Sequence, residues 1–134
     1  MIATKLKKGD KIGVVSPSNP VAQDDPQMNN GIKFLAEMGF EVVLGQHVFS
    51  NTLGYAASPQ EKAADINAMF ANESVKAIIC SQGGYTANAC LPYLDWQTIK
   101  ANPKIFLGIS DILLLLNAIY AQTGLATFHA TATM

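Results

Sequence analysis

The stretch KIFLGISDILLLL, residues 104–116, decides how this chain folds. It starts after a proline with a short apolar run, passes through Gly-Ile-Ser-Asp, and continues as a leucine-rich segment without a helix breaker before Gly124. The apolar run has the length and composition of a buried strand, and the segment behind it is typical of a buried helix that ends at a glycine. The sequence therefore predicts a strand at 105–107 and a helix at 111–123, with Ser110 in the tight turn between them.

Ser110 lies at a junction that forms the ligand-binding edge of the sheet in α/β proteins. The first turn of a helix leaves backbone N–H groups free, so the serine hydroxyl would lie beside hydrogen-bond donors. This is the geometry of a nucleophile elbow, in which the same turn supplies an oxyanion donor. The alternative is a structural helix cap, because serine is a preferred N-cap residue and Asp111 would complement the helix dipole. The pattern departs from Gly-x-Ser-x-Gly, since Ile112 stands in place of the second glycine.

The composition indicates one compact globular domain over residues 1–134. The chain is 49% hydrophobic and only 14% charged, with a formal net charge of −1. A chain of this length can bury a sizeable core, and so lean a charged surface suggests that a partner or further domain covers part of it. The charge gives no electrostatic case for binding nucleic acid or an anionic membrane. Because neither a signal-peptide core nor a run long enough to span a bilayer is found, we expect a cytoplasmic protein.

Strands and helices alternate along the chain. Strands are predicted at residues 11–15, 40–44, 75–80, 105–107 and 126–130. Helices are predicted at residues 26–38, 59–71, 87–94, 95–101 and 111–123. This alternation predicts an α/β fold, a three-layer Rossmann- or flavodoxin-like parallel sheet with helices on both faces.

Two of the helix starts carry clear capping signals. Asp25 followed by Pro26 forms an N-cap and N1 pair, and Ser-Pro-Gln-Glu at 58–61 forms a capping box. Three apolar residues at three-residue steps are expected on the inner face of the first helix: Ile32, Leu35 and Met38.

Gly83 and Gly84 follow the predicted strand at 75–80, and in a parallel sheet they share an edge with Ser110. Paired glycines after a strand let backbone N–H groups approach a ligand, although they also make simple sharp turns. Neither Gly-x-Gly-x-x-Gly nor a P-loop is present, so nucleotide binding is weakly supported. Cys80 and Cys90 fall in apolar elements and are expected as buried free thiols rather than a disulfide or metal pair.

Several motifs are together similar to those of the LD-carboxypeptidases, a serine peptidase family that includes the microcin C self-immunity proteins. The motifs are Ser-Gln-Gly-Gly-Tyr at 81–85, Leu-Pro-Tyr-Leu-Asp at 91–95, Ile-Lys-Ala-Asn-Pro-Lys at 99–104, Gly-Ile-Ser-Asp at 108–111 and Thr-Gly-Leu-Ala-Thr-Phe-His at 123–129. The likeness continues through Tyr55, Lys62 and Asp65 to Ser-Pro-Ser at 16–18. It therefore covers essentially the whole chain, as the N-terminal domain of the family.

The resemblance implies roles for individual residues. Ser110 would be the nucleophile, and the backbone amides of Asp111 and Gly84 would form the oxyanion hole. We further expect Gly83, Tyr85 and Ser18 to contact the substrate, although turn formation is the commoner role of serines in such loops. No cofactor and no metal are expected.

The family's catalytic glutamate and histidine belong to a C-terminal domain beyond residue 134, and His129 matches a family histidine that is not the base. We therefore expect this chain to be a truncated, nucleophile-bearing part that is inactive alone. The expected partner is either a second copy in a homodimer or the missing C-terminal domain.

The expected substrate is a small peptide or peptidyl compound, namely the L,D amide bond of a murein tetrapeptide. A microcin C-type amide is the alternative, because Gln82 stands where one branch of the family has arginine. Two further departures are Leu113 in place of a threonine and Ala130 where the family continues Gly-Pro. A non-catalytic binding or assembly module with the same fold is a second reading of the chain, and a flavodoxin-like nucleotide binder is a third.

Overall fold

The computed structural model of the chain describes residues 1–131 and 133–134. These residues form one parallel sheet in the order β2-β1-β3-β4-β5. The strands are β1 (Lys11–Val15), β2 (Glu41–Leu44), β3 (Val75–Cys80), β4 (Ile105–Gly108) and β5 (Phe128–His129). The helices are α1 (Pro26–Glu37), α2 (Pro59–Ala71), α3 (Trp96–Ala101) and α4 (Leu113–Thr123), with short 3₁₀ helices η1 (Ala87–Tyr93) and η2 (Ser110–Ile112). The predicted parallel α/β fold is confirmed.

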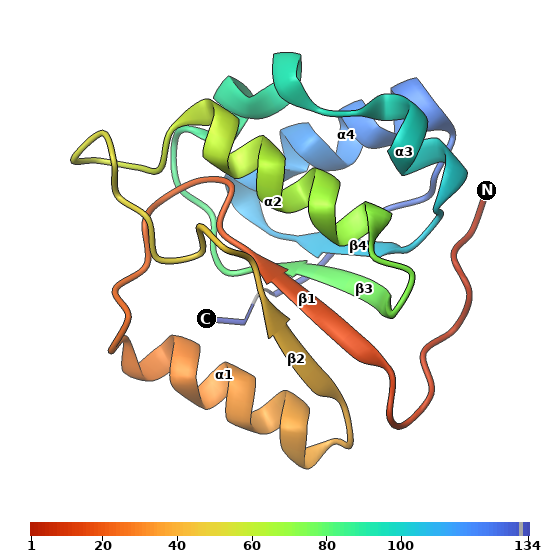
Figure 1. Cartoon of the computed structure of the whole chain (residues 1–134), viewed down its shortest axis with the longest axis horizontal. Coiled ribbons are helices and arrows are strands. Elements are labelled where there is room, and N and C mark those ends of the chain that lie inside the picture. Colours follow the sequence, from red (N-terminus) through yellow and green to blue (C-terminus); the bar gives the residue numbers. More distant parts are fainter. Residues whose placement is uncertain (132) are drawn as a thin grey trace.

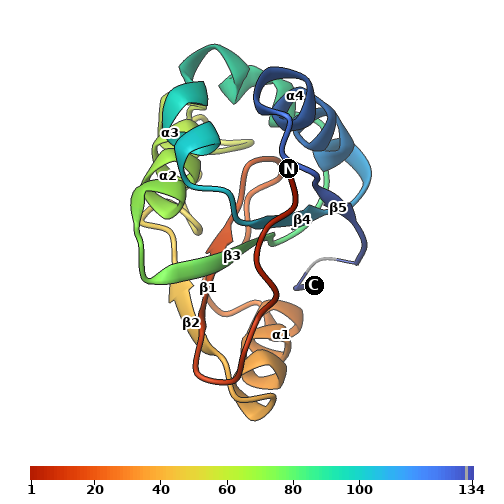
Figure 2. The same cartoon turned by 90° about the vertical axis from the view of Figure 1, so that its right-hand side faces the viewer.

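The helices lie on both faces of the sheet, as predicted. Figures 1 and 2 show α1 on one face and α2, α3 and α4 on the other. The chain moves outward from β1 to β2, returns to β3 beside β1, and then continues outward to β5. The loops after β1 and β3 therefore leave the sheet side by side, at the point where the strand order reverses. Ligands bind at such switch points in open α/β sheets.

The main core lies between the sheet and the helices α2, α3 and α4. Phe70 of α2 and Phe106 of β4 are fully buried and stack with their ring centroids 5.8 Å apart. Cys80 and Cys90 belong to the same cluster as buried free thiols, as expected. Burial raises the pKa of the Cys90 thiol to about 11, so it stays protonated at neutral pH.

A smaller core lies under α1. Met28 is the one residue of this helix that is fully buried, and Ile32 packs beside it only in part. Met38 was expected on the inner face but is 46% exposed. It is the C-cap residue, at the end of α1 far from the buried Met28.

Both predicted capping signals are present. The Glu61 N–H donates to Ser58 Oγ at 3.2 Å, and the Ser58 N–H donates to the Glu61 carboxylate at 2.7 Å. Asp25 accepts a hydrogen bond from the Met28 N–H at 3.0 Å. These local signals fix the first turns of α1 and α2.

Three elements differ from their predictions. The helix predicted at 87–94 is the 3₁₀ helix η1 (Ala87–Tyr93), which contains Pro92, a residue without the N–H that a longer α-helix needs there. The helix predicted from residue 111 starts with the 3₁₀ turn η2, and β5 pairs over Phe128–His129 only.

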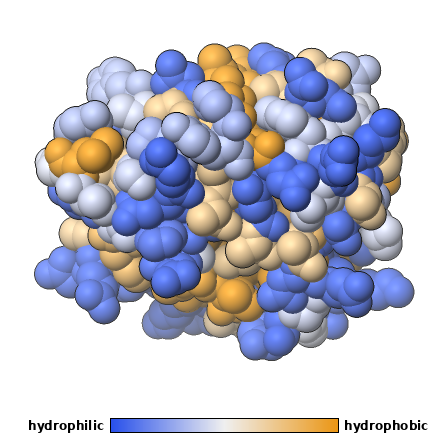
Figure 3. All heavy atoms as spheres, turned by 45° about the horizontal axis from the view of Figure 1, so that its top comes forward, coloured by the Kyte–Doolittle hydropathy of each residue, from blue (hydrophilic) through white to orange (hydrophobic). Residues whose placement is uncertain are grey.

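The surface mixes hydrophilic side chains with small apolar patches (Figure 3). Four large apolar residues near one edge of the sheet are exposed: Leu113, Leu114, Tyr120 and Phe128. Among the described residues, the helices lack the combined length and apolarity that crossing a bilayer would require.

Candidate active site

Ser110 occupies a strained turn at the end of β4. Of the described residues other than glycine, it alone has a positive φ, at 58°. This conformation costs a residue with a side chain about 1–2 kcal/mol. Ser110 is exposed, and no side-chain hydrogen bond caps η2. The helix-cap alternative is therefore wrong, and the strain agrees with a nucleophile elbow.

Two glycines make room for this turn. A Cβ atom on Gly108 would overlap the side chain of Ile112. A Cβ atom on Gly83 would lie 2.9 Å from Ser110 Cβ and 3.3 Å from Ser110 Oγ, closer than such atoms normally pack. The loop after β3 therefore lies directly against Ser110, as the parallel sheet predicted.

Gly84 lies against the loop after β1. Its φ is 147°, and a Cβ atom on it would overlap the side chain of Asn19 and lie 2.6 Å from Ser18 Oγ. The Asn19 N–H also donates to the Gly83 carbonyl at 3.3 Å. Loops from β1, β3 and β4 thus meet at one edge of the sheet.

The Asp111 carboxylate ties these three loops together. Its Oδ2 accepts hydrogen bonds from Ser18 Oγ at 2.6 Å and from the Ala87 N–H at 2.9 Å. Ser18 Oγ also accepts from the Thr86 N–H at 3.3 Å, and Thr86 Oγ1 donates to the Ser18 carbonyl at 3.2 Å. Ser18 is buried and its hydroxyl is fully engaged, so substrate contact by this residue stays a prediction.

Lys62 of α2 extends this network. It is only 3% exposed, and its Nζ donates to Thr86 Oγ1 at 2.6 Å and to the Thr86 carbonyl at 3.3 Å. Burial lowers the pKa of Lys62, while Cys90 and Asp111 act in the opposite direction. Sequence reasoning missed both Lys62 and the Asp111 carboxylate as parts of the site. The one available signal was the presence of Lys62 among the family-like residues.

The other predicted residues lie at the same edge or away from it. Tyr85 is 88% exposed, so its contact with a substrate stays a prediction. His129 ends β5 and is exposed. The Nδ1 atom of His47 lies 3.3 Å from Ser50 Oγ and 3.8 Å from Glu61 Oε1. Within the described part of the chain, neither histidine is hydrogen-bonded to Ser110.

The family model for the LD-carboxypeptidase N-terminal domain matches residues 12–130. The chain belongs to the LD-carboxypeptidase family. It is 40% identical over 125 residues to a Bacillus subtilis protein named as a probable murein peptide carboxypeptidase, covering 92% of this chain and 38% of that one. It is 36% identical over 133 residues to the microcin C7 self-immunity protein MccF of Escherichia coli, covering 98% of this chain and 39% of that one.

The fold of this LD-carboxypeptidase-family chain also matches a solved structure. The crystal structure of an MccF-like protein from Bacillus anthracis has a TM-score of 0.93 and 40% identity. The match covers 99% of this chain and 41% of the other. The chain thus spans about two fifths of the length of the relatives that it matches.

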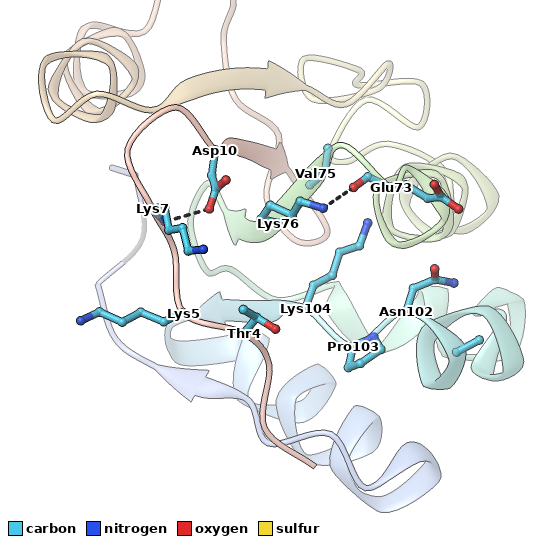
Figure 4. A pocket seen from close by; sticks show the side chains of 11 residues that line it. Thr4, Lys5, Lys7, Asp10, Glu73, Val75, Lys76, Asn102, Pro103 and Lys104 are labelled. Atoms are coloured by element: carbon cyan, nitrogen blue, oxygen red, sulfur yellow. Dashed lines mark hydrogen bonds between the residues drawn. The ribbon is translucent and has the colours of Figure 1, made fainter.

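A hollow lies at the opposite edge of the sheet from Ser110. It has a volume of about 520 Å³ and is formed around the first residues of β3 and the residues just before β4. Figure 4 shows Lys76 of β3, and Lys104 just before β4, reaching toward Glu73, which lies just after α2. Lys104 Nζ donates to the carbonyls of Met69, at 2.8 Å, and Asn72. The buried lysine of this hollow is therefore engaged in capping the C-terminus of α2.

Proposed function

We propose that this chain is the nucleophile-bearing part of a serine LD-carboxypeptidase-type hydrolase, which cleaves an amide bond in a small peptide or peptidyl substrate. The observation that carries the proposal is the strained, exposed turn at Ser110, against which Gly83 packs without room for a side chain. A merely structural serine would gain nothing from a left-handed backbone that glycine adopts more easily. Membership of the LD-carboxypeptidase family supports the same reaction class.

In the proposed reaction, Ser110 Oγ attacks the carbonyl carbon of the scissile amide and forms a tetrahedral intermediate. The backbone N–H groups of Asp111 and Gly84 would stabilise its oxyanion, as preorganised amides do in other serine hydrolases. The proton of Ser110 must pass to a general base, which then protonates the leaving amine. By resemblance to the family, this base would be a residue of the C-terminal domain that carries the family's glutamate and histidine, and neither His47 nor His129 is hydrogen-bonded to Ser110 among the described residues.

Two substrates are proposed, in order of preference. The first is the L,D amide bond of a murein tetrapeptide, supported by the name of the Bacillus subtilis relative. The second is a microcin C-type amide between an amino acid and a nucleotide-like group. Gln82 in place of a branch-specific arginine, and the fold match to an MccF-like protein, support this second possibility.

A fusion protein would test the proposal. Residues 1–130 would replace the matching part of the Bacillus subtilis relative, which supplies the remainder of a family chain. We expect the folded fusion to release the terminal D-alanine from a murein tetrapeptide, and its Ser110→Ala variant to lose this activity by more than about a thousandfold. A peptidyl-nucleotide substrate assayed in parallel would distinguish the second possibility.

Two outcomes would contradict the proposal. One is a fusion that folds, as judged by circular dichroism and gel filtration, but cleaves neither substrate. The other is a fusion that turns over equally fast with alanine at position 110. For the 134-residue chain alone we expect negligible activity, and turnover that depends on Ser110 would overturn that expectation.

A further inference from the structure

We infer that Lys62 is a positioning residue of the Ser110 site, which holds the loop carrying Gly83 and Gly84 against the loop carrying Asp111. The inference rests on the proposed function, in which Ser110 is the nucleophile. It is supported by the hydrogen bonds that join Lys62 to Asp111 through Thr86 and Ser18, and its first test measures NMR signals rather than turnover.

Lys62 is placed where a cation is unfavourable. It lies in the first turns of α2, close to the positive end of the helix dipole, and it is almost fully buried. Taking an ammonium group out of water costs several kcal/mol unless it gains strong partners. Its partners are the hydroxyl and the carbonyl of a single residue, Thr86. The stabilisation that offsets this burial therefore also fixes Thr86 in one position.

Hydrogen bonds from Thr86 in turn hold the loops that carry the proposed oxyanion donors. Thr86 exchanges two hydrogen bonds with Ser18, and Ser18 donates to the Asp111 carboxylate. The adjacent Ala87 N–H closes the ring by donating to the same carboxylate oxygen. Gly84 is two residues before Thr86, so both proposed oxyanion amides belong to residues in or beside this ring. Ser18 and Ala87 are buried, which shields these bonds from competition by water.

The direction of every hydrogen bond in the network is fixed, because each bond includes a group that can only donate or only accept. The Lys62 ammonium and the backbone N–H groups can only donate, and the Asp111 carboxylate and the backbone carbonyls can only accept. Thr86 Oγ1 accepts from Lys62 and so donates to the Ser18 carbonyl, while Ser18 Oγ accepts from the Thr86 N–H and so donates to Asp111. One arrangement of hydroxyl protons satisfies all the partners. The network is therefore rigid as well as buried.

Among the described residues, Asp111 is the acid that is linked to Lys62 through the network. The Cys90 thiol stays protonated because burial raises its pKa. Two acids on α2 are engaged elsewhere, since Glu61 accepts from the Ser58 N–H and Asp65 accepts from the His47 N–H. Lys62 and Asp111 are thus the positive and negative ends of one hydrogen-bonded chain.

Amide NMR spectra of the 134-residue chain would test this inference. We would compare wild type with Lys62→Met, Lys62→Arg and the matched control Lys104→Met, which removes the other buried lysine. In Lys62→Met we expect the Gly84 and Asp111 amide signals to move and exchange of the Ala87 N–H to become about tenfold faster. Lys62→Arg should restore all three, because arginine keeps the donors and the charge. Lys104→Met should leave the positions of the Gly84 and Asp111 signals unchanged.

Two results would overturn the inference. One is a Lys62→Met spectrum in which Gly84 and Asp111 keep their wild-type positions. The other is an equal disturbance by Lys104→Met, which would reveal general destabilisation. If Lys62→Met does not fold, Thr86→Val replaces it, because it removes the bridging hydroxyl but keeps the carbonyl acceptor. It should move the same two signals, and unmoved signals would again refute the inference.

Activity of the fusion separates this inference from the proposed function. In an active fusion, Lys62→Met should lower kcat at least tenfold with little change in KM, and Lys62→Arg should restore it. An unchanged kcat would refute the positioning role and leave the proposed function standing. An inactive fusion whose NMR changes are as expected would refute the proposed function and leave the positioning geometry standing.

Discussion

Lys62 and Lys104 are buried near opposite ends of α2, and both ammonium groups donate to backbone carbonyls. Lys104 lies at the C-terminal end, where the helix dipole favours a cation and where unpaired carbonyls need donors. Lys62 lies near the N-terminal end, where the dipole opposes it, and its acceptors belong to a loop rather than to the helix. The comparison teaches that burial of a charge does not by itself mark a functional residue. What distinguishes Lys62 is that its partners lead on to Ser18 and Asp111.

The largest effect on stability is expected from Gly84→Ala, at the Ser110 edge. The new Cβ would have to displace Asn19 and the Ser18 hydroxyl, in addition to straining a positive φ. We expect the free energy of unfolding to fall by about 3 kcal/mol in urea titrations. The matched control is Gly54→Ala, which has a positive φ but open space around it and should cost only about 1 kcal/mol. Equal costs would show that the loops at this edge are loosely packed.

The next largest loss of stability is expected at the opposite edge of the sheet, where Lys104 lies. Lys104→Met should leave the carbonyls of Met69 and Asn72 without their donor and lower the free energy of unfolding by about 2 kcal/mol. In the fusion it should leave kcat within about twofold of wild type, since its bonds lead only to the end of α2. A large loss of kcat with retained stability would break the contrast between the two lysines.

A smaller effect of opposite sign is expected from Ser110→Gly. Glycine removes the strain of the left-handed backbone, so the free energy of unfolding should rise by about 1 kcal/mol. Ser110→Ala keeps the strain and should change stability little, which makes it the control for loss of the hydroxyl. If both variants behave alike in thermal and urea unfolding, Ser110 is not strained.

Stability is also expected to depend on pH at the hollow. Burial and the nearby Lys76 lower the pKa of Lys104 from its ordinary value of 10.5 to about 8. Below about pH 8 the lysine is charged in both the folded and unfolded states, so the cost of burying the charge is fully present. Between about pH 8 and 10.5 it is neutral in the folded state but charged in the unfolded one. Wild type should therefore gain stability relative to Lys104→Met across this interval, as measured by urea unfolding at each pH. A flat or falling difference would contradict the lowered pKa.

Sequence patterns predicted those parts of the fold whose signals are local. Strands β1 and β3 have the predicted bounds, and α2 starts at its capping box. The packing of Gly83 against Ser110 also followed, because parallel strands bring their carboxyl ends to one edge. The 3₁₀ form of η1 was missed because composition favoured a helix there and the effect of Pro92 was underestimated.

The network at the site could not be predicted in the same way. It joins Ser18, Lys62, Thr86 and Asp111, which come from four different segments, and no periodicity relates them. Lysine on a helix is ordinarily exposed, so Lys62 carried no sign of its burial. The strained backbone at Ser110 could not be predicted from the sequence either, because serine is far more common as a helix cap than in a left-handed turn.

The fixed direction of the hydrogen bonds between Lys62 and Asp111 constrains how this protein can evolve. An acceptor at position 62, or a donor at position 111, would leave hydroxyl groups of Ser18 and Thr86 facing partners of the wrong kind. Each change is therefore costly, and neither compensates for the other, because the Thr86 N–H can only donate and the Ser18 carbonyl can only accept. Homologous proteins that keep this arrangement of loops should accordingly keep a donor at 62 and an acceptor at 111.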